Sequence, residues 1–372
     1  MSKPYLLYTI LGITALHRNA MSPSEKAQHL AMIYRQKTFS SYNSALQNVT
    51  TDNYESLLLT SVYLQPLVPV PDLPATDEAV LEWLSTYLAM TQGLRLLVSL
   101  KWSRGLEKLS IFPVFRRELK TLPPCPLIIP MQEDPRMYAQ VNEDGGSPYR
   151  PNPPIMYREP VSAGYDMSNL PFQPQTLMGV GATPHRPPAW ESSPTWLLPA
   201  PAFLPPPLMA LLVSLIKEPE SGPLDLYGPT ILPALHALSP IFLSLYYYHL
   251  TPDVFVRIVV FPTFLTAGFI RLVRHQEPRA IVIMAWWIAF VTLIPSVWWI
   301  KNSVQQILQA TSNVMMRNTQ SNQKLLMDAM DGAFKVARLA QTRGKEVAAK
   351  SIFEGWEGVN WDREVGYEAK EL

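Results

Sequence analysis

The feature that most constrains this fold is a run of 21 residues without a charged side chain, AIVIMAWWIAFVTLIPSVWWI, at positions 280–300. Arg279 and Lys301 flank the run. About 20 apolar residues in a helix cross the hydrocarbon core of a membrane, and tryptophans are common at membrane interfaces. The run therefore forms either a membrane anchor or the buried centre of a folded domain.

Pro295 separates these two interpretations, because it stands six residues from the end of the run. Proline breaks a helix interior, so we predict one helix that ends near Ile294 and another that begins near Ser296. Three prolines also break up the apolar run 229–250. Proline is tolerated in membrane helices, so a membrane protein is disfavoured but not ruled out, and we expect a cytoplasmic or nuclear location.

Composition narrows the class of protein further. The net charge is +1, so no general basic excess would draw the chain onto nucleic acid. Cys125 is the one cysteine, which excludes an intrachain disulfide and a cysteine-based zinc site and fits a reducing compartment. Charged residues make up 16% of the chain, below the usual value of about 25%.

Both ends of the chain carry helical periodicity. We predict a first helix with Pro4 in its first turn and a core-facing stripe of Leu6, Ile10, Ile13 and Leu16. A second helix is predicted to open with Ser22-Pro23-Ser24-Glu25. Ser22 and Glu25 match a capping box, with Pro23 at the first helical position. Further helical runs are expected at 53–66, 78–100, 208–216, 229–250, 253–274, 280–310 and 320–353.

The prolines divide the chain. Residues 121–207 hold 21 of its 37 prolines, which predicts a long irregular insertion. Four segments follow: an N-terminal helical part at 1–120, the insertion at 121–207, a C-terminal helical part of the same domain at 208–310, and a polar amphipathic tail at 311–372. The apolar side of the tail is predicted to consist of Leu326, Met330, Phe334, Ala337 and Ala340. The predicted fold class is all-α, a multi-helix bundle.

Motifs for catalysis or metal binding are scarce. The sequence lacks a GxSxG elbow, a Walker phosphate loop and an HExxH pair. GVGATP at 179–184 lacks the third glycine of a dinucleotide site. Asp328 and Asp331 would share one helix face, but nearby lysines indicate a solvated surface. We therefore expect no metal and no cofactor.

Aromatic residues gather in the last third of the helical sequence. Such a set forms either ordinary core or the wall of a pocket for an apolar molecule. The predicted wall residues are Phe264, Phe269, Trp286, Trp287 and Phe290.

Two blocks of the chain resemble a known family. PYLLYTILGITALH (4–17), the stretch 34–64 and LEWLSTYLAMTQGLRLL (81–97) resemble the C-terminal regulatory domain of fungal zinc-cluster transcription factors, in particular the sterol-uptake-control regulators. The matching residues in this block are Ala15, Leu16, His17, Tyr34, Ala45, Leu46, Asn53 and Leu57. The stretch 261–308 resembles the family's distal block through Pro262, Phe269, Leu272, Pro278, Ala280, Trp298 and Trp299.

The resemblance implies an all-helical bundle around an apolar internal cavity, a sterol- or terpenoid-like ligand, and pairing with a second copy or with a full-length transcription factor. The chain also departs from the family. The family's DNA-binding module needs six cysteines, so we expect no direct contact with nucleic acid. Ala285 to Ile294 carries no charged side chain where relatives carry His or Arg, and the tail 311–372 has no counterpart.

Two functions remain open on the sequence. The first is a regulatory protein that binds an apolar ligand without catalysis, in transcription regulation. The second is an enzyme of fungal secondary metabolism, a cyclase or pericyclase, that folds a terpenoid or polyketide substrate in the same cavity. The sequence does not decide whether the chain is an enzyme.

Overall fold

The structure is a computed structural model that describes residues 3–68, 75–98, 202–216, 225–295, 298–317, 323–356 and 359–362. Within these ranges all regular secondary structure is helical, which confirms the predicted all-α class. The predicted irregular insertion lies outside the described residues except for 202–207, where Pro206 opens a helix. Cys125 and the GVGATP motif also lie outside them.

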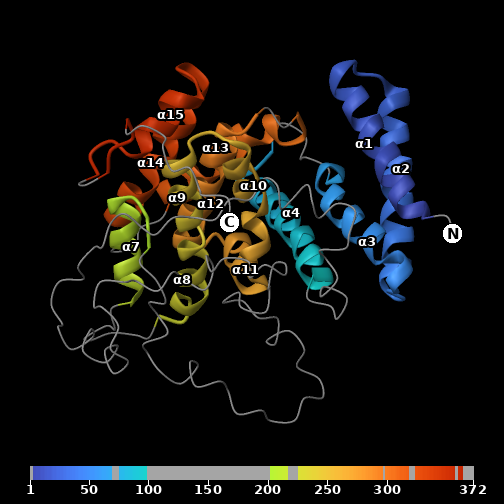
Figure 1. Cartoon of the computed structure of the whole chain (residues 1–372), viewed down its shortest axis with the longest axis horizontal. Helices are drawn as coiled ribbons and strands as arrows, with labels where there is room; N and C mark the ends of the chain where they lie inside the picture. Colours follow the sequence, from blue (N-terminus) through green and yellow to red (C-terminus); the bar gives the residue numbers. More distant parts are fainter. Residues whose placement is uncertain are drawn as a thin grey trace, which may run out of the picture.

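The N-terminal lobe consists of α1 (Pro4–Met21), α2 (Glu25–Leu46), α3 (Thr51–Tyr63) and the short 3-10 helix η1 (Gln65–Leu67). Helices α1 and α2 pair at one end of the molecule, and α3 lies between them and α4 (Asp77–Val98) (Figure 1). Tyrosines form much of the lobe's core, and their hydroxyls are paired. The Tyr5 hydroxyl lies 2.7 Å from Ser56 Oγ, and the Tyr54 hydroxyl donates to the Leu97 carbonyl at 3.0 Å.

The buried face of α1 differs from the predicted one. The helix buries Tyr5, Thr9, Gly12 and Ala15, whereas the predicted residues Leu6, Ile13 and Leu16 are only partly buried against this core and Ile10 is 51% exposed. The physical reason is close packing at small residues, since a Cβ added to Gly12 would lie 3.1 Å from Leu67 Cδ2. The close approach of Leu67 to Gly12 therefore determines which face of α1 is buried. The larger aliphatic side chains lie at the edge of that face.

The start of α2 also differs from the predicted one. The helix begins at Glu25, and its N-cap is Ser24, whose side chain accepts a hydrogen bond from the Ala27 amide at 3.2 Å. The predicted cap, Ser22, lies before the helix, and so does Pro23. Ser24 is held by its own amide, which donates to Asn19 Oδ1 at 3.0 Å.

The main body consists of α4 and all the described helices that follow it in sequence. Three of the predicted helical runs divide: 229–250 and 320–353 each form two helices, and 253–274 forms two helices joined by a 3-10 turn. The helices are α7 (Pro206–Ile216), α8 (Gly228–His236), α9 (Ser239–Tyr248), α10 (Pro252–Val260), η8 (Phe261–Phe264), α11 (Ala267–Arg274), α12 (Pro278–Leu293), α13 (Trp298–Arg317), α14 (Gln323–Thr342) and α15 (Lys345–Ile352).

Helix α12 lies at the centre of the main body (Figure 1). It contacts α8, α10, α11, α13, α14 and α15, and every residue in it except Arg279 and Thr292 is buried. A helix without a solvent face needs no polar stripe, which explains its lack of charge. The helix ends at Leu293, Ile294 is extended and accepts a hydrogen bond from Lys345 Nζ, and α13 begins at Trp298. The predicted break in the charge-free run is confirmed.

The described segment whose length and apolar composition would suit a membrane span is not α12. Among the described residues, Gly228–Tyr248 is long and apolar enough to cross a membrane, and 72% of its apolar window is buried inside the protein. The bent pair Pro252–Phe264 and Ala267–Arg274 passes the same test only when taken as one broken span. Helix α12 has 16 residues and is shorter than a span.

The described part of the predicted tail packs into the main body. The predicted boundary at 310 falls inside α13, and α14 lies against α12. Helix α14 buries Leu326, Met330 and Ala337, with Phe334 and Ala340 partly buried against the same core. Contact is close at Gly332, where an added Cβ would lie 2.7 Å from Trp286 Cζ2.

Aromatic residues attach the last described segment to the main body. Trp356 packs on Phe203 with ring centres 5.0 Å apart, and Trp361 stacks on His249 at 4.1 Å. Phe353 contacts both tryptophans, each at 5.2 Å. Residues near the C-terminus therefore cover side chains of α9 and of the segment before α7.

Candidate functional site

The five predicted wall residues lie in or against the core of the main body. Trp286, Trp287 and Phe290 belong to α12, Phe269 to α11 and Phe264 to η8. Phe269 and Phe290 are fully buried, and Phe264 is partly buried. The two indole groups join helices: Trp286 Nε1 donates to the Ala329 carbonyl at 2.7 Å, and Trp287 Nε1 donates to the Ile258 carbonyl at 2.8 Å.

The structure brings only some of these five together. Phe242 packs edge-on against Phe290 at 4.8 Å and against Trp286 at 5.1 Å, so these rings form one cluster. Trp287 instead meets Tyr87 at 6.3 Å and Phe261 at 6.4 Å. Protein side chains occupy the space beside these rings. A role for the five residues as a ligand wall stays a prediction.

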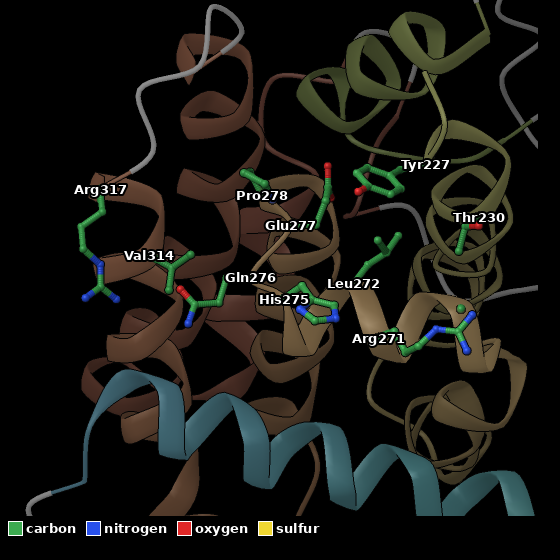
Figure 2. A pocket seen from close by; sticks show the side chains of 11 residues that line it. Tyr227, Thr230, Arg271, Leu272, His275, Gln276, Glu277, Pro278, Val314 and Arg317 are labelled. Atoms are coloured by element: carbon green, nitrogen blue, oxygen red, sulfur yellow. The ribbon is translucent and has the colours of Figure 1, made fainter. Parts of the chain in front are cut away.

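A pocket of about 660 Å³ lies elsewhere, between α8, the junction of α11 and α12, and the end of α13. We call it the Arg271 pocket. None of the five predicted wall residues is among the described residues that line it. Figure 2 shows His275 and Gln276 near its middle, with Arg317 toward one end and Arg271 toward the other. The lining consists of Tyr227, Thr230, Gly268, Arg271, Leu272, His275, Gln276, Glu277, Pro278, Val314 and Arg317.

One face of α11 supplies the pocket's central wall. Gly268, Arg271, Leu272 and His275 follow the i, i+3, i+4, i+7 spacing that places residues on one side of a helix. The helix begins at the N-cap Thr266, whose hydroxyl accepts from the Phe269 amide at 3.1 Å. This stripe sets a cationic side chain beside an apolar one within one turn.

A tight turn connects this wall to α12. Gln276 has a φ of 58°, a left-handed conformation that reverses the chain within one residue. Glu277 then caps α12, because its Oε2 accepts from the Ala280 amide at 2.9 Å, and Pro278 occupies the first helical position. The turn places Gln276 and Glu277 on the pocket surface.

The floor of the pocket is apolar and its rim is polar. Leu272, Pro278 and Val314 are buried, whereas Arg271 and His275 are exposed. Ligand pockets commonly enclose about 300–1,000 Å³, with apolar walls and a few polar groups that orient the ligand. The volume of the Arg271 pocket falls within this range, and Leu272, Pro278 and Val314 provide apolar surface within a mostly polar lining.

An ion network fixes one side of the pocket. Arg279 Nε donates to Glu277 Oε1 at 2.6 Å, and Arg279 Nη2 donates to Asp225 Oδ1 at 3.1 Å. Asp225 Oδ1 also accepts from the Tyr227 and Gly228 amides, both at 3.1 Å. The hydrogen bond from Arg279 holds the pKa of Asp225 below its ordinary value. Both carboxylates are thus engaged, and they join the start of α8 to the start of α12.

The other basic residues on the rim differ in whether they contact a carboxylate. Arg317 Nη2 donates to Asp77 Oδ2 at 2.9 Å, and Asn313 holds the other oxygen of that carboxylate at 3.0 Å. The Arg271 guanidinium and the His275 imidazole make no hydrogen bond or ion pair with any residue that the structure describes. The pocket therefore carries an excess of positive charge at its α11 wall.

Metal binding has no support in the described part of the chain. No group of three or more His, Cys, Asp or Glu side chains there is placed to hold a metal ion. Asp328 and Asp331 are both exposed on α14, as the sequence indicated.

Comparison with models of protein families, with curated proteins and with solved structures finds no match for this chain. The argument for function therefore depends on the Arg271 pocket. Sequence reasoning missed this pocket, although one signal was present: Arg271 and His275 are four residues apart in a helical run. That spacing alone does not show whether the two side chains have counterions.

Proposed function

We propose that this chain is a ligand-binding regulatory protein without catalysis, similar to the regulatory domain of fungal zinc-cluster transcription factors. Its proposed ligand is an apolar molecule of sterol or terpenoid size. The observation that carries the proposal is the pocket of about 660 Å³ with its buried floor of Leu272, Pro278 and Val314. Its α11 and α12 walls belong to the stretch 261–308, which carries the resemblance.

The pocket is well placed to convert binding into a conformational signal. It joins α8, α11, α12 and α13, and the ion pair between Arg317 and Asp77 extends it to α4. A ligand that contacts these helices only in this arrangement stabilises the arrangement in proportion to its occupancy. The regulated partner we propose is a second copy of the chain or a full-length transcription factor in the nucleus or cytoplasm.

The proposal is tested by ligand binding to the purified protein. Native mass spectrometry should show a bound lipid, and added cholesterol or retinol should raise the melting temperature by several degrees, because ligand at 100 times its Kd stabilises by about 2.7 kcal/mol. Val314→Phe fills the pocket floor and should abolish the shift. Val347→Phe, on an exposed position of α15, is the matched control. No bound species and no shift would refute the proposal.

A catalytic use of the same pocket is the second candidate, a cyclase or pericyclase. The observation that favours it is the presence of the Tyr227 hydroxyl and the His275 imidazole beside an apolar floor. Histidine is the commonest general acid or base, and an apolar pocket can hold a flexible substrate in a reactive conformer. Turnover of a polyene substrate that is lost in His275→Gln, with binding retained, would favour the enzyme; binding without turnover favours the regulator.

A further inference from the structure

Arg271 differs from the other arginines around the pocket. Arg274, on the same helix, pairs with Glu82 at 3.2 Å. Arg279 and Arg317 likewise have carboxylate partners. Among the described residues, the Arg271 guanidinium has neither an ion pair nor a hydrogen bond, although it lines the pocket. Arg271 is exposed, so an anionic group on a ligand in the pocket can reach its guanidinium in place of solvent.

The neighbouring side chains favour an anion over a cation. His275 lies one turn after Arg271 on the same face of α11, and Figure 2 shows both in the pocket lining. The hydroxyl-bearing residues Tyr227 and Thr230 lie at the N-cap and in the first turn of α8. Glu277 is the one acidic residue among the described lining residues, and both of its oxygens already accept hydrogen bonds. The pocket therefore offers hydrogen-bond donors and no free carboxylate.

The apolar residues at the floor of the pocket indicate which other groups the ligand contains. A free inorganic anion would leave Leu272, Pro278 and Val314 uncovered, which forfeits the contribution of apolar burial. A neutral sterol would cover the floor but leave the Arg271 charge without a partner. A molecule with an apolar body and one carboxylate satisfies both parts of the pocket. The planar guanidinium matches a carboxylate with two parallel hydrogen bonds.

We infer that the ligand of the Arg271 pocket is an amphipathic acid whose carboxylate binds Arg271 and whose apolar body covers Leu272, Pro278 and Val314. This inference rests on the proposed ligand-binding function and narrows the ligand class.

The test compares two ligands with one carbon skeleton, all-trans-retinoic acid and all-trans-retinol, by calorimetric titration of the whole chain. Arg271 is exposed, and an exposed ion pair contributes about 0.2–1 kcal/mol, so the acid should bind up to about fivefold more tightly than the alcohol. Arg271→Gln should remove that preference, so that the acid and the alcohol bind the variant with equal affinity. Arg274→Gln is the matched control: it removes an arginine from the same helix, outside the pocket, and should retain the preference.

Each outcome bears on one of the two claims. Equal affinities for the acid and the alcohol in the unmodified protein would overturn the inference and leave the proposed function standing. A preference for the acid that survives Arg271→Gln would overturn the inference as well. Failure of both ligands to bind would contradict the proposed function, and the inference with it. Circular dichroism melts of both variants check that the fold is retained.

Discussion

The N-terminal lobe and the main body bury their aromatic residues in different ways. In the lobe, buried tyrosines join helices through their hydroxyls, as Tyr5 does with Ser56 and Tyr54 with the Leu97 carbonyl. In the main body, rings pack on rings around Phe242. Directional bonds thus contribute strongly to the lobe, whereas the body depends on filled volume. The lobe should respond most to loss of a polar group and the body most to a change in volume.

Phe242→Ala should have the largest effect. Phe242 is fully buried and packs against Trp286, Phe290 and Trp356. Its removal should lower the free energy of unfolding by about 3–5 kcal/mol, measured by urea denaturation followed by circular dichroism. Leu7→Ala, at an exposed position of α1, is the control and should change stability by less than about 0.5 kcal/mol. A cost below about 1 kcal/mol for Phe242→Ala would contradict the ring cluster.

Two glycine substitutions test close packing in the two regions. An added Cβ at Gly332 would lie 2.7 Å from the rigid Trp286 ring, whereas at Gly12 it would lie 3.1 Å from the flexible end of Leu67. Gly332→Ala should destabilise the protein by about 1–3 kcal/mol. Gly12→Ala should be nearly neutral, because Leu67 can move and alanine gains up to about 1 kcal/mol of helix propensity. Equal losses of melting temperature in the two variants would contradict the proposed difference in packing between the two regions.

Tyr54→Phe tests the polar core of the lobe. The substitution leaves the Leu97 carbonyl without this donor and should cost about 1 kcal/mol, against almost none for the exposed Tyr63→Phe. Burial raises the pKa of Tyr54 to about 12. Because the folded pKa is raised, the stabilisation is complete below pH 10, the ordinary value, and is lost as pH rises through about 12. Burial also raises the pKa values of Tyr42 and Tyr87, so ultraviolet titration of the phenols should show one fewer late-ionising tyrosine in the variant than in the unmodified protein.

His249 should give the smallest effect, on the C-terminal attachment of the main body. Burial lowers the pKa of His249, which stacks on Trp361. Because the pKa of His249 is lower in the folded chain, the unfolded chain takes up the proton first as the pH falls. The contribution of neutral His249 to stability is therefore complete above about pH 6.5 and declines below that pH. His249→Gly, which suits the φ of 52° and the ψ of −150°, should flatten the decline of melting temperature between about pH 7.5 and pH 5.5. An unchanged slope would contradict the assignment.

The sequence predicted the centre of the fold better than its edges. The charge-free run and Pro295 sufficed to place α12 and the break after it, because a helix with no polar face must be buried on all sides. The buried face of α1 was mispredicted. Hydrophobicity ranks Leu and Ile above Gly and Ala, whereas close helix packing at Gly12 depends on the partner, Leu67.

The Arg271 pocket was beyond sequence reasoning for a related reason. Its walls come from segments that are far apart in the chain, α8, α11 and α13. The charge of Arg271 is conspicuous only because the neighbouring arginines are paired, and the partners of Arg274 and Arg317 lie on α4, nearly 200 residues or more earlier in the chain. An unpaired cation is thus a property of the tertiary structure.

The complete burial of α12 has a consequence for synthesis of the chain. Helix α14, which covers one side of α12 and accepts the hydrogen bond from Trp286, begins at Gln323, whereas α12 ends at Leu293. Helix α12, which carries no charged residue after Arg279, therefore emerges from the ribosome before α14 emerges to cover it. Exposed apolar surface at that stage favours aggregation. Chains truncated before α14 should accordingly be recovered as insoluble protein or bound to chaperones, even though the whole of α12 is present.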